Sequence, residues 1–228
     1  MSTPIVFLAS GFSLAGSNGL DAAHVVKPSE RAEVGHSYGH LPPNPDQLGG
    51  AFNFSNLAGG EVSEKDFKGR WTLLYFGYAR CTDSCPVAIP VIAQAAKELR
   101  QSGIDTRAVF VDIEASAIGN LRRGAQNSGD HALHPAAADR MRALKGLQAS
   151  FGDELELMTG TRGQLSAATV AFRVAREHIP PRAAERGHSI NHSSLVYMLD
   201  TRARVAGYGY HTSTAKVLVE TVRKLRRA

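Results

Sequence analysis

The pattern of apolar positions is clearest between residues 71 and 112. A continuous apolar run over residues 71–76 is typical of a strand buried on both faces. A helix follows, with Pro86 in its first turn, where a missing N–H costs nothing. Its buried face is predicted from four apolar residues at helical spacing: Ile89, Ile92, Ala96 and Leu99. A second strand over residues 106–111, closed by Asp112, completes a β-α-β unit, and such units have parallel strands.

Weaker patterns flank this unit on both sides. Before it, Phe52 and Phe54 alternate with polar residues ahead of Gly59-Gly60, which predicts a short hairpin. After it, we expect helices over residues 135–151 and 164–173, strands over 155–158, 195–199 and 204–208, and a last helix capped by Thr212 or Ser213. The fold class is therefore α/β, in the element order of a thioredoxin-like fold with an N-terminal hairpin extension.

Residues 1–48 are expected to form an irregular N-terminal tail, a signal or linker segment, and residues 49–228 a single domain. The tail contains His24, His36 and His40, for which the sequence predicts no role. Its apolar stretch at residues 4–16 has the length of an export-signal core, although no Lys or Arg precedes it. We expect a location in the cell envelope facing the periplasm, with membrane association through an N-terminal anchor as an open alternative.

Composition sets bounds on these expectations. The chain has 228 residues, 43% of them apolar, which is enough for one substantial core. It carries 26 Lys and Arg against 21 Asp and Glu, and several of the basic residues lie in the last helix, where cations complement the helix dipole. Because no basic run is interleaved with aromatic residues, nucleic-acid binding is not expected.

The chain has two cysteines, Cys81 and Cys85, in the loop between the first predicted strand and the helix. Ligands in open α/β sheets gather outside the carboxyl ends of the strands, where this loop lies. A disulfide between two cysteines so close together would close only a very short loop and add little to stability. We therefore interpret them as a redox or metal-binding pair. A helix N-terminus favours an anion, so we expect lowered thiol pKa values.

His192 is the third candidate residue. It precedes the predicted strand at residues 195–199, which we expect in the same sheet as residues 71–76, so the imidazole can face the cysteine loop. Two thiolates and one imidazole form a donor set suited to copper and to zinc.

At this point the sequence resembles a known family. The run Tyr75-Phe76-Gly77-Tyr78-Ala79-Arg80-Cys81-Thr82-Asp83-Ser84-Cys85-Pro86 is similar to the signature of the Sco/SenC copper proteins. The segment from His192 to Asp200 resembles the second family motif, in which a histidine-serine pair enters a strand ending in Asp. Shorter similarities cover residues 49–52, 66–70, 110–112 and 157–160, so the resemblance extends over about residues 48–226.

The resemblance implies a thioredoxin-like copper chaperone that binds one Cu⁺ or Cu²⁺ ion through Cys81, Cys85 and His192. It also implies a role in maturing the copper site of cytochrome c oxidase, with the copper-receiving subunit or another copper chaperone as partner. Thr82 replaces a common family proline, and Ile113-Glu114-Ala115 follows Asp112 where a proline and an acidic-basic run are usual. The stretch containing His131 and His134 is longer than usual. These departures bear on the partner surface.

Two enzymatic alternatives remain. A thiol–disulfide oxidoreductase would use the Cys81–Cys85 pair, but thioredoxins separate their cysteines by two residues and place a cis-proline where residues 188–195 contain none. A peroxidase would use one of the cysteines, but the second cysteine would favour a local disulfide. Both comparisons favour a metallochaperone without catalytic activity, although disulfide reduction by the same dithiol is compatible with it.

Overall fold

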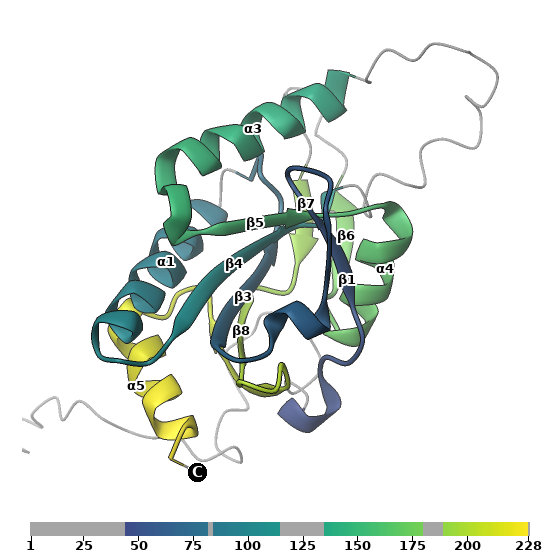
Figure 1. Ribbon diagram of the computed structural model, residues 1–228. Helices are drawn as coiled ribbons and strands as arrows, with labels where there is room; N and C mark the ends of the chain where they lie inside the picture. The colour runs from purple at the N-terminus through teal and green to yellow at the C-terminus, as the bar shows by residue number, and fades with distance from the viewer. Residues whose placement is uncertain (1–43, 82–83, 115–134, 180–188, 228) are drawn as a thin grey trace, which may run out of the picture. The chain divides into compact units, whose positions relative to one another are not determined.

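The structure is a computed structural model that describes residues 44–81, 84–114, 135–179 and 189–227 (Figure 1). These residues all belong to one compact unit, Pro42–Ala228. Most of the predicted tail lies outside the described residues, as do the five histidines without a predicted role: His24, His36, His40, His131 and His134.

Within the described residues, seven strands form the main sheet, in the order β2-β1-β5-β4-β3-β8-β9. The strands are β1 (Asn53–Asn56), β2 (Glu61–Ser63), β3 (Trp71–Gly77), β4 (Thr106–Asp112), β5 (Glu156–Thr159), β8 (Leu195–Leu199) and β9 (Val205–Tyr210). At the centre, β3 runs parallel to β4 and antiparallel to β8. The carboxyl end of β3 therefore lies beside the start of β8.

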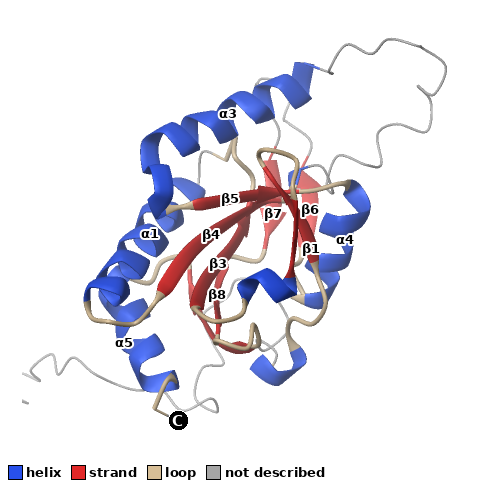
Figure 2. Cartoon of the chain, in the orientation of Figure 1, coloured by secondary structure: helices blue, strands red, loops and turns tan. Residues whose placement is uncertain are grey.

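Helices cover both faces of this sheet (Figure 2). They are α1 (Cys85–Gln101), α3 (Pro135–Phe151), α4 (Arg162–Ala171) and α5 (Ala215–Leu225), with short 3₁₀ turns η1 (Pro45–Gln47), η2 (Glu64–Phe67) and η4 (Gly152–Glu154). One apolar cluster joins α1, α3 and α5 to Tyr75 and Phe110 of the central strands. A second cluster joins α4 and η2 to Phe76 and Val111 on the opposite face. The alternation along β3 thus supplies both layers of the core.

The predicted β-α-β unit is confirmed as β3, α1 and β4, and so is the hairpin of β1 and β2. The cap of α5 was predicted wrongly. Its N-cap is Thr214, whose side-chain oxygen accepts a hydrogen bond from the Val217 N–H, because the turn after β9 extends further than the sequence pattern indicates.

A second sheet was missing from the sequence prediction. Among the described residues, β6 (Arg176–Ile179) and β7 (Ser189–His192) pair as an antiparallel ribbon, separate from the main sheet. His192 is therefore the last residue of a strand and not part of a loop. None of the helices in the described parts of the chain has the length and hydropathy that a membrane span requires.

Candidate metal centre

The two cysteines lie at the carboxyl end of β3, where the sequence predicts them. A tight turn follows this strand, and in it the Cys81 N–H donates to the Tyr78 carbonyl oxygen at 3.0 Å. The helix α1 then begins at Cys85, with Pro86 in its first turn. Cys81 thus lies on the turn and Cys85 on the helix, and both are in the thiol form.

Cys85 is almost completely buried, with 2% of its surface exposed, whereas Cys81 is partly exposed. The hydrogen bond with Cys81, followed by burial, raises the pKa of the Cys85 thiol. The expectation of a lowered pKa was therefore wrong for Cys85. The dipole at the start of α1 is outweighed because a second sulfur and the apolar core both disfavour a charge there.

Gly77 makes room for the Cys85 sulfur. A Cβ atom placed on Gly77 would lie 2.7 Å from Cys85 Sγ and 2.8 Å from Phe110 Cε2, closer than atoms can pack. The end of β3 therefore passes directly beneath the buried sulfur. This contact shows that the backbone of the central strand is part of the wall of the site.

Tyr75 lies on the core side of the dithiol. Its side chain is fully buried, and its hydroxyl donates to Ser84 Oγ at 3.4 Å, just before Cys85. Burial, together with the nearby Cys85 sulfur, raises the pKa of the Tyr75 hydroxyl. The hydroxyl therefore keeps its proton and serves as a hydrogen-bond donor near the dithiol.

His192 is 8% exposed and lies against two tyrosine rings. Its ring centroid is 6.0 Å from that of Tyr75 and 6.2 Å from that of Tyr78, both in edge-to-face geometry. Nδ1 lies 3.1 Å from the Ser193 carbonyl oxygen, which can only accept, so Nδ1 carries the proton. Nε2 then has a lone pair, which is the form of histidine that binds metals.

The three candidate residues are near one another without being assembled. Cys81 and Cys85 are in contact, and His192 is a neighbour of Tyr75 and Tyr78, which adjoin the dithiol in the fold. In the part of the chain that the structure describes, no three His, Cys, Asp or Glu side chains are placed together to hold a metal ion. The donor set fits a borderline-soft metal, but the side chains must reorient to converge on it.

Two carboxylates beneath the turn were not identified as site residues from the sequence. Asp112, at the end of β4, accepts a hydrogen bond from the Ala79 N–H at 2.9 Å, and burial raises its pKa to about 6. Glu114 forms an ion pair with Arg80, the residue before Cys81. The strand end at Asp112 was a visible signal, but nothing in the spacing indicated the pair of Arg80 and Glu114.

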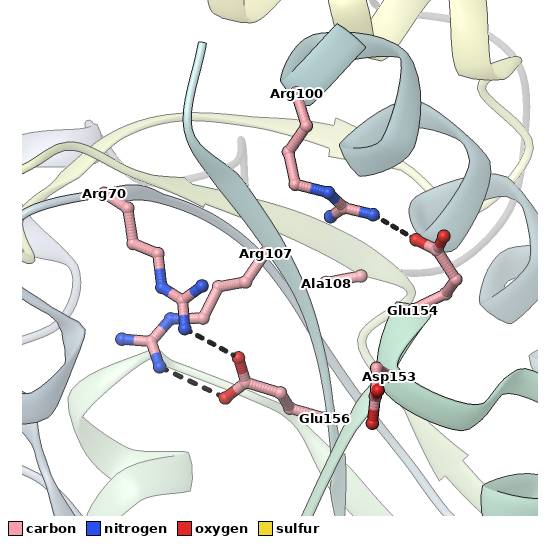
Figure 3. Close-up of a pocket in the computed structure, with 7 residues that line it drawn as sticks. All are labelled: Arg70, Arg100, Arg107, Ala108, Asp153, Glu154 and Glu156. Atoms are coloured by element: carbon pink, nitrogen blue, oxygen red, sulfur yellow. Dashed lines mark hydrogen bonds and ion pairs between the residues drawn. The ribbon is translucent and has the colours of Figure 1, made fainter. Parts of the chain in front are cut away.

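A cavity of about 250 Å³ lies near the opposite end of β4 (Figure 3). Its arginines are paired with carboxylates: Arg70 and Arg107 bind Glu156, and Arg100 binds Glu154. Because these charges are matched within the cluster, we interpret it as a structural network rather than an anion site. The Arg100–Glu154 pair of this cluster serves below as the control for the Arg80–Glu114 pair near the dithiol.

Fold and site together define a class: an α/β domain with a Cys-x-x-x-Cys dithiol between the central strand and the first helix, and a histidine nearby. The sequence model of the SCO1/SenC family matches residues 42–117 and 134–227. The chain therefore belongs to the SCO1/SenC family.

Individual relatives agree with this assignment. The chain is 24% identical over 174 residues to SCO2-like protein RP587 of Rickettsia prowazekii, covering 76% of this chain and 75% of the relative. Its fold matches the structure of Arabidopsis thaliana ScoI with copper bound, with a TM-score of 0.62, 21% identity, and coverage of 79% of this chain and 98% of that one. It also matches BsSco, a member of the Sco family of cytochrome c oxidase assembly proteins in which a disulfide switch was identified. That match has a TM-score of 0.53, 17% identity, and coverage of 81% and 96%. These similarities support the predicted thioredoxin-like fold.

Proposed function

We propose that this chain is a copper chaperone that binds one copper ion through Cys81, Cys85 and His192. The observation that carries the proposal is the contact between the two thiols, with a histidine against the neighbouring Tyr75 and Tyr78 rings whose Nε2 has a lone pair. Thiolates suit Cu⁺, and an imidazole nitrogen adds the donor that Cu²⁺ prefers.

The family supports copper as the metal and the oxidase as the destination. The Arabidopsis relative has copper bound, and BsSco belongs to a group of cytochrome c oxidase assembly proteins. We therefore propose that this chain delivers copper to, or matures, the copper site of cytochrome c oxidase. Its partner is then the copper-receiving oxidase subunit or another copper chaperone, and its place is the cell envelope, facing the periplasm.

The test is copper titration of the reduced protein. We expect one copper per chain with thiolate charge-transfer bands for Cu²⁺, and loss of tight binding in Cys81→Ser and in Cys85→Ser. Oxidation to the Cys81–Cys85 disulfide removes the thiolates, so oxidised protein should not take up copper. Unchanged stoichiometry in both serine variants would contradict the proposal.

His192→Ala tests the nitrogen ligand separately. Cu⁺ accepts two thiolates alone and should still bind, whereas the affinity for Cu²⁺ should fall much further. His188→Ala, four residues earlier in the sequence, is the control. If His188→Ala weakens Cu²⁺ binding and His192→Ala does not, the ligand assignment is wrong.

The second candidate is a thiol–disulfide oxidoreductase that uses the same pair. The contact of the two cysteines favours it, and BsSco is associated with a disulfide switch. His192→Ala also separates these functions. In a copper chaperone the dithiol should still exchange with disulfides, because that step needs only the two cysteines, whereas in an oxidoreductase the loss of the histidine should slow the exchange. If that variant exchanged disulfides slowly and bound copper as before, the oxidoreductase would be the better description.

A further inference from the structure

The turn that carries Cys81 is attached to the end of β4 by two neighbouring carboxylates. Asp112 accepts hydrogen bonds from the Ala79 N–H at 2.9 Å and from the Glu114 N–H at 3.0 Å. Glu114 then receives the Arg80 guanidinium, whose Nε donates to Oε2 at 3.3 Å and whose Nη2 donates to Oε1. Each of the two residues before Cys81 is therefore held by a carboxylate.

Burial makes this attachment stiff. Asp112 and Glu114 have no exposed surface, and the Arg80 side chain is 25% exposed. A buried carboxylate is costly to separate from its cation, and a two-pronged guanidinium–carboxylate contact also fixes direction. Moving Arg80 away from Glu114 would break both hydrogen bonds of this contact to a buried carboxylate. The turn therefore has little freedom at the residue next to Cys81.

The two sulfurs differ in what holds them. Cys85 is fixed by α1 and by its packing against β3, whereas the position of Cys81 depends on the turn from Tyr78. The separation of the two sulfurs, and hence their fit to one metal ion, depends on where the turn is held. The Arg80–Glu114 pair is a buried contact that holds the residue beside Cys81.

We propose that Glu114 is a positioning residue of the metal centre, which holds Cys81 through Arg80 at the sulfur–sulfur separation that one copper ion requires. The inference rests on the proposed copper-binding function. It extends that function to a residue that neither touches the metal nor lies in the cysteine motif. Because the same separation governs disulfide formation, the pair also sets the equilibrium between dithiol and disulfide.

Glu114→Gln tests this, since it keeps the shape of the side chain and removes its charge. We expect the affinity for Cu²⁺ to fall about 10- to 100-fold, as is typical when an outer contact to a metal ligand is lost. In the metal-free protein, we expect the Cys81–Cys85 equilibrium with glutathione to shift several-fold. Both are measured at a temperature where circular dichroism shows the variant to be folded.

The matched control is Glu154→Gln. Glu154 pairs with Arg100 in the cluster of Figure 3, at the far end of α1 from Cys85, so it has the same chemistry without contact to the turn. Being partly exposed, it should change both readouts by less than about two-fold. If Glu114→Gln does not fold, Arg80→Gln/Glu114→Gln replaces both charges with amides, and the same losses are expected.

A folded Glu114→Gln or double variant with a wild-type value of either readout would overturn the positioning role. An equal loss in Glu154→Gln would also overturn it, because the effect would then follow general destabilisation. Failure of the proposed function looks different: the wild-type protein would take up no copper, while its disulfide equilibrium would still respond to Glu114→Gln.

Discussion

Gly77→Ala should disturb the dithiol from the side of the strand. The added Cβ would lie 2.7 Å from Cys85 Sγ and 2.8 Å from Phe110 Cε2, whereas such atoms pack at about 3.5–4.0 Å. Gly77 is not among the glycines with positive φ, so steric overlap and not backbone strain is the cause. The Cys85 sulfur must then move by roughly 1 Å.

The magnitude follows from burial. Cys85 and Phe110 are both buried, so neither can swing into solvent, and overpacking of this kind costs about 1–3 kcal/mol of unfolding free energy. Metal sites tolerate errors of only about 0.2 Å in their bond lengths. We therefore expect Gly77→Ala to lower the copper affinity by a larger factor than it lowers the equilibrium constant for folding.

The assay is urea unfolding of the metal-free protein together with copper titration. The control is Gly146→Ala in α3, where an added Cβ meets nothing within 4 Å and should stabilise the helix by about 0.5–1 kcal/mol. Cys85→Ala should relieve part of the cost of Gly77→Ala in a double-mutant cycle. Wild-type stability and copper affinity in Gly77→Ala would refute the reasoning.

Three further predictions concern stability. Burial raises the pKa of Asp112 from 3.8 to about 6. Between about pH 4 and about pH 6 the Asp112 carboxyl therefore stays protonated in the folded protein but loses its proton in the unfolded chain. Stability should therefore fall, by up to about 3 kcal/mol, as pH rises from about 4 to about 6, and Asp112→Asn should flatten this slope in urea titrations. Tyr197→Phe removes a buried hydroxyl that donates to the Phe172 carbonyl oxygen at 2.9 Å and should cost about 1–2 kcal/mol; an unchanged melting temperature would show that this bond contributes nothing. Thr214→Ala should cost about 1 kcal/mol by removing the cap on the Val217 N–H, which thermal unfolding against Thr212→Ala would measure.

The sequence predicted the parts of the fold that bury apolar side chains in a regular pattern. The run at residues 71–76 is continuously apolar because β3 is buried on both faces. The apolar residues from Ile89 to Leu99 recur at helical spacing because α1 is buried on one face. The ribbon of β6 and β7 left no such pattern. Its pairing is made by backbone hydrogen bonds, which almost any residue can supply, and Arg176-Glu177-His178-Ile179 does not alternate.

The candidate site was predictable where the chemistry is local. Cys81 and Cys85 could be singled out because a dithiol before a helix has few structural uses, and His192 because it precedes a strand next to β3. Their role as metal ligands stays a prediction. The direction of the Cys85 pKa shift could not be predicted from the sequence, because it depends on the contact of the sulfur with Cys81 and on how deeply the sulfur is buried. The Arg80–Glu114 ion pair could not be predicted either, because it joins two segments that only the parallel pairing of β3 and β4 brings together.

The separate ribbon has a consequence for how copper would change the molecule. The cysteines are attached to the main sheet, whereas His192 ends β7, whose partner strand is β6. An ion held by Cys81, Cys85 and His192 would cross-link the two sheets. Its binding free energy would then stabilise the ribbon of β6 and β7 against local unfolding. Amide hydrogen exchange in β6 and β7 should then slow on copper loading and recover on release.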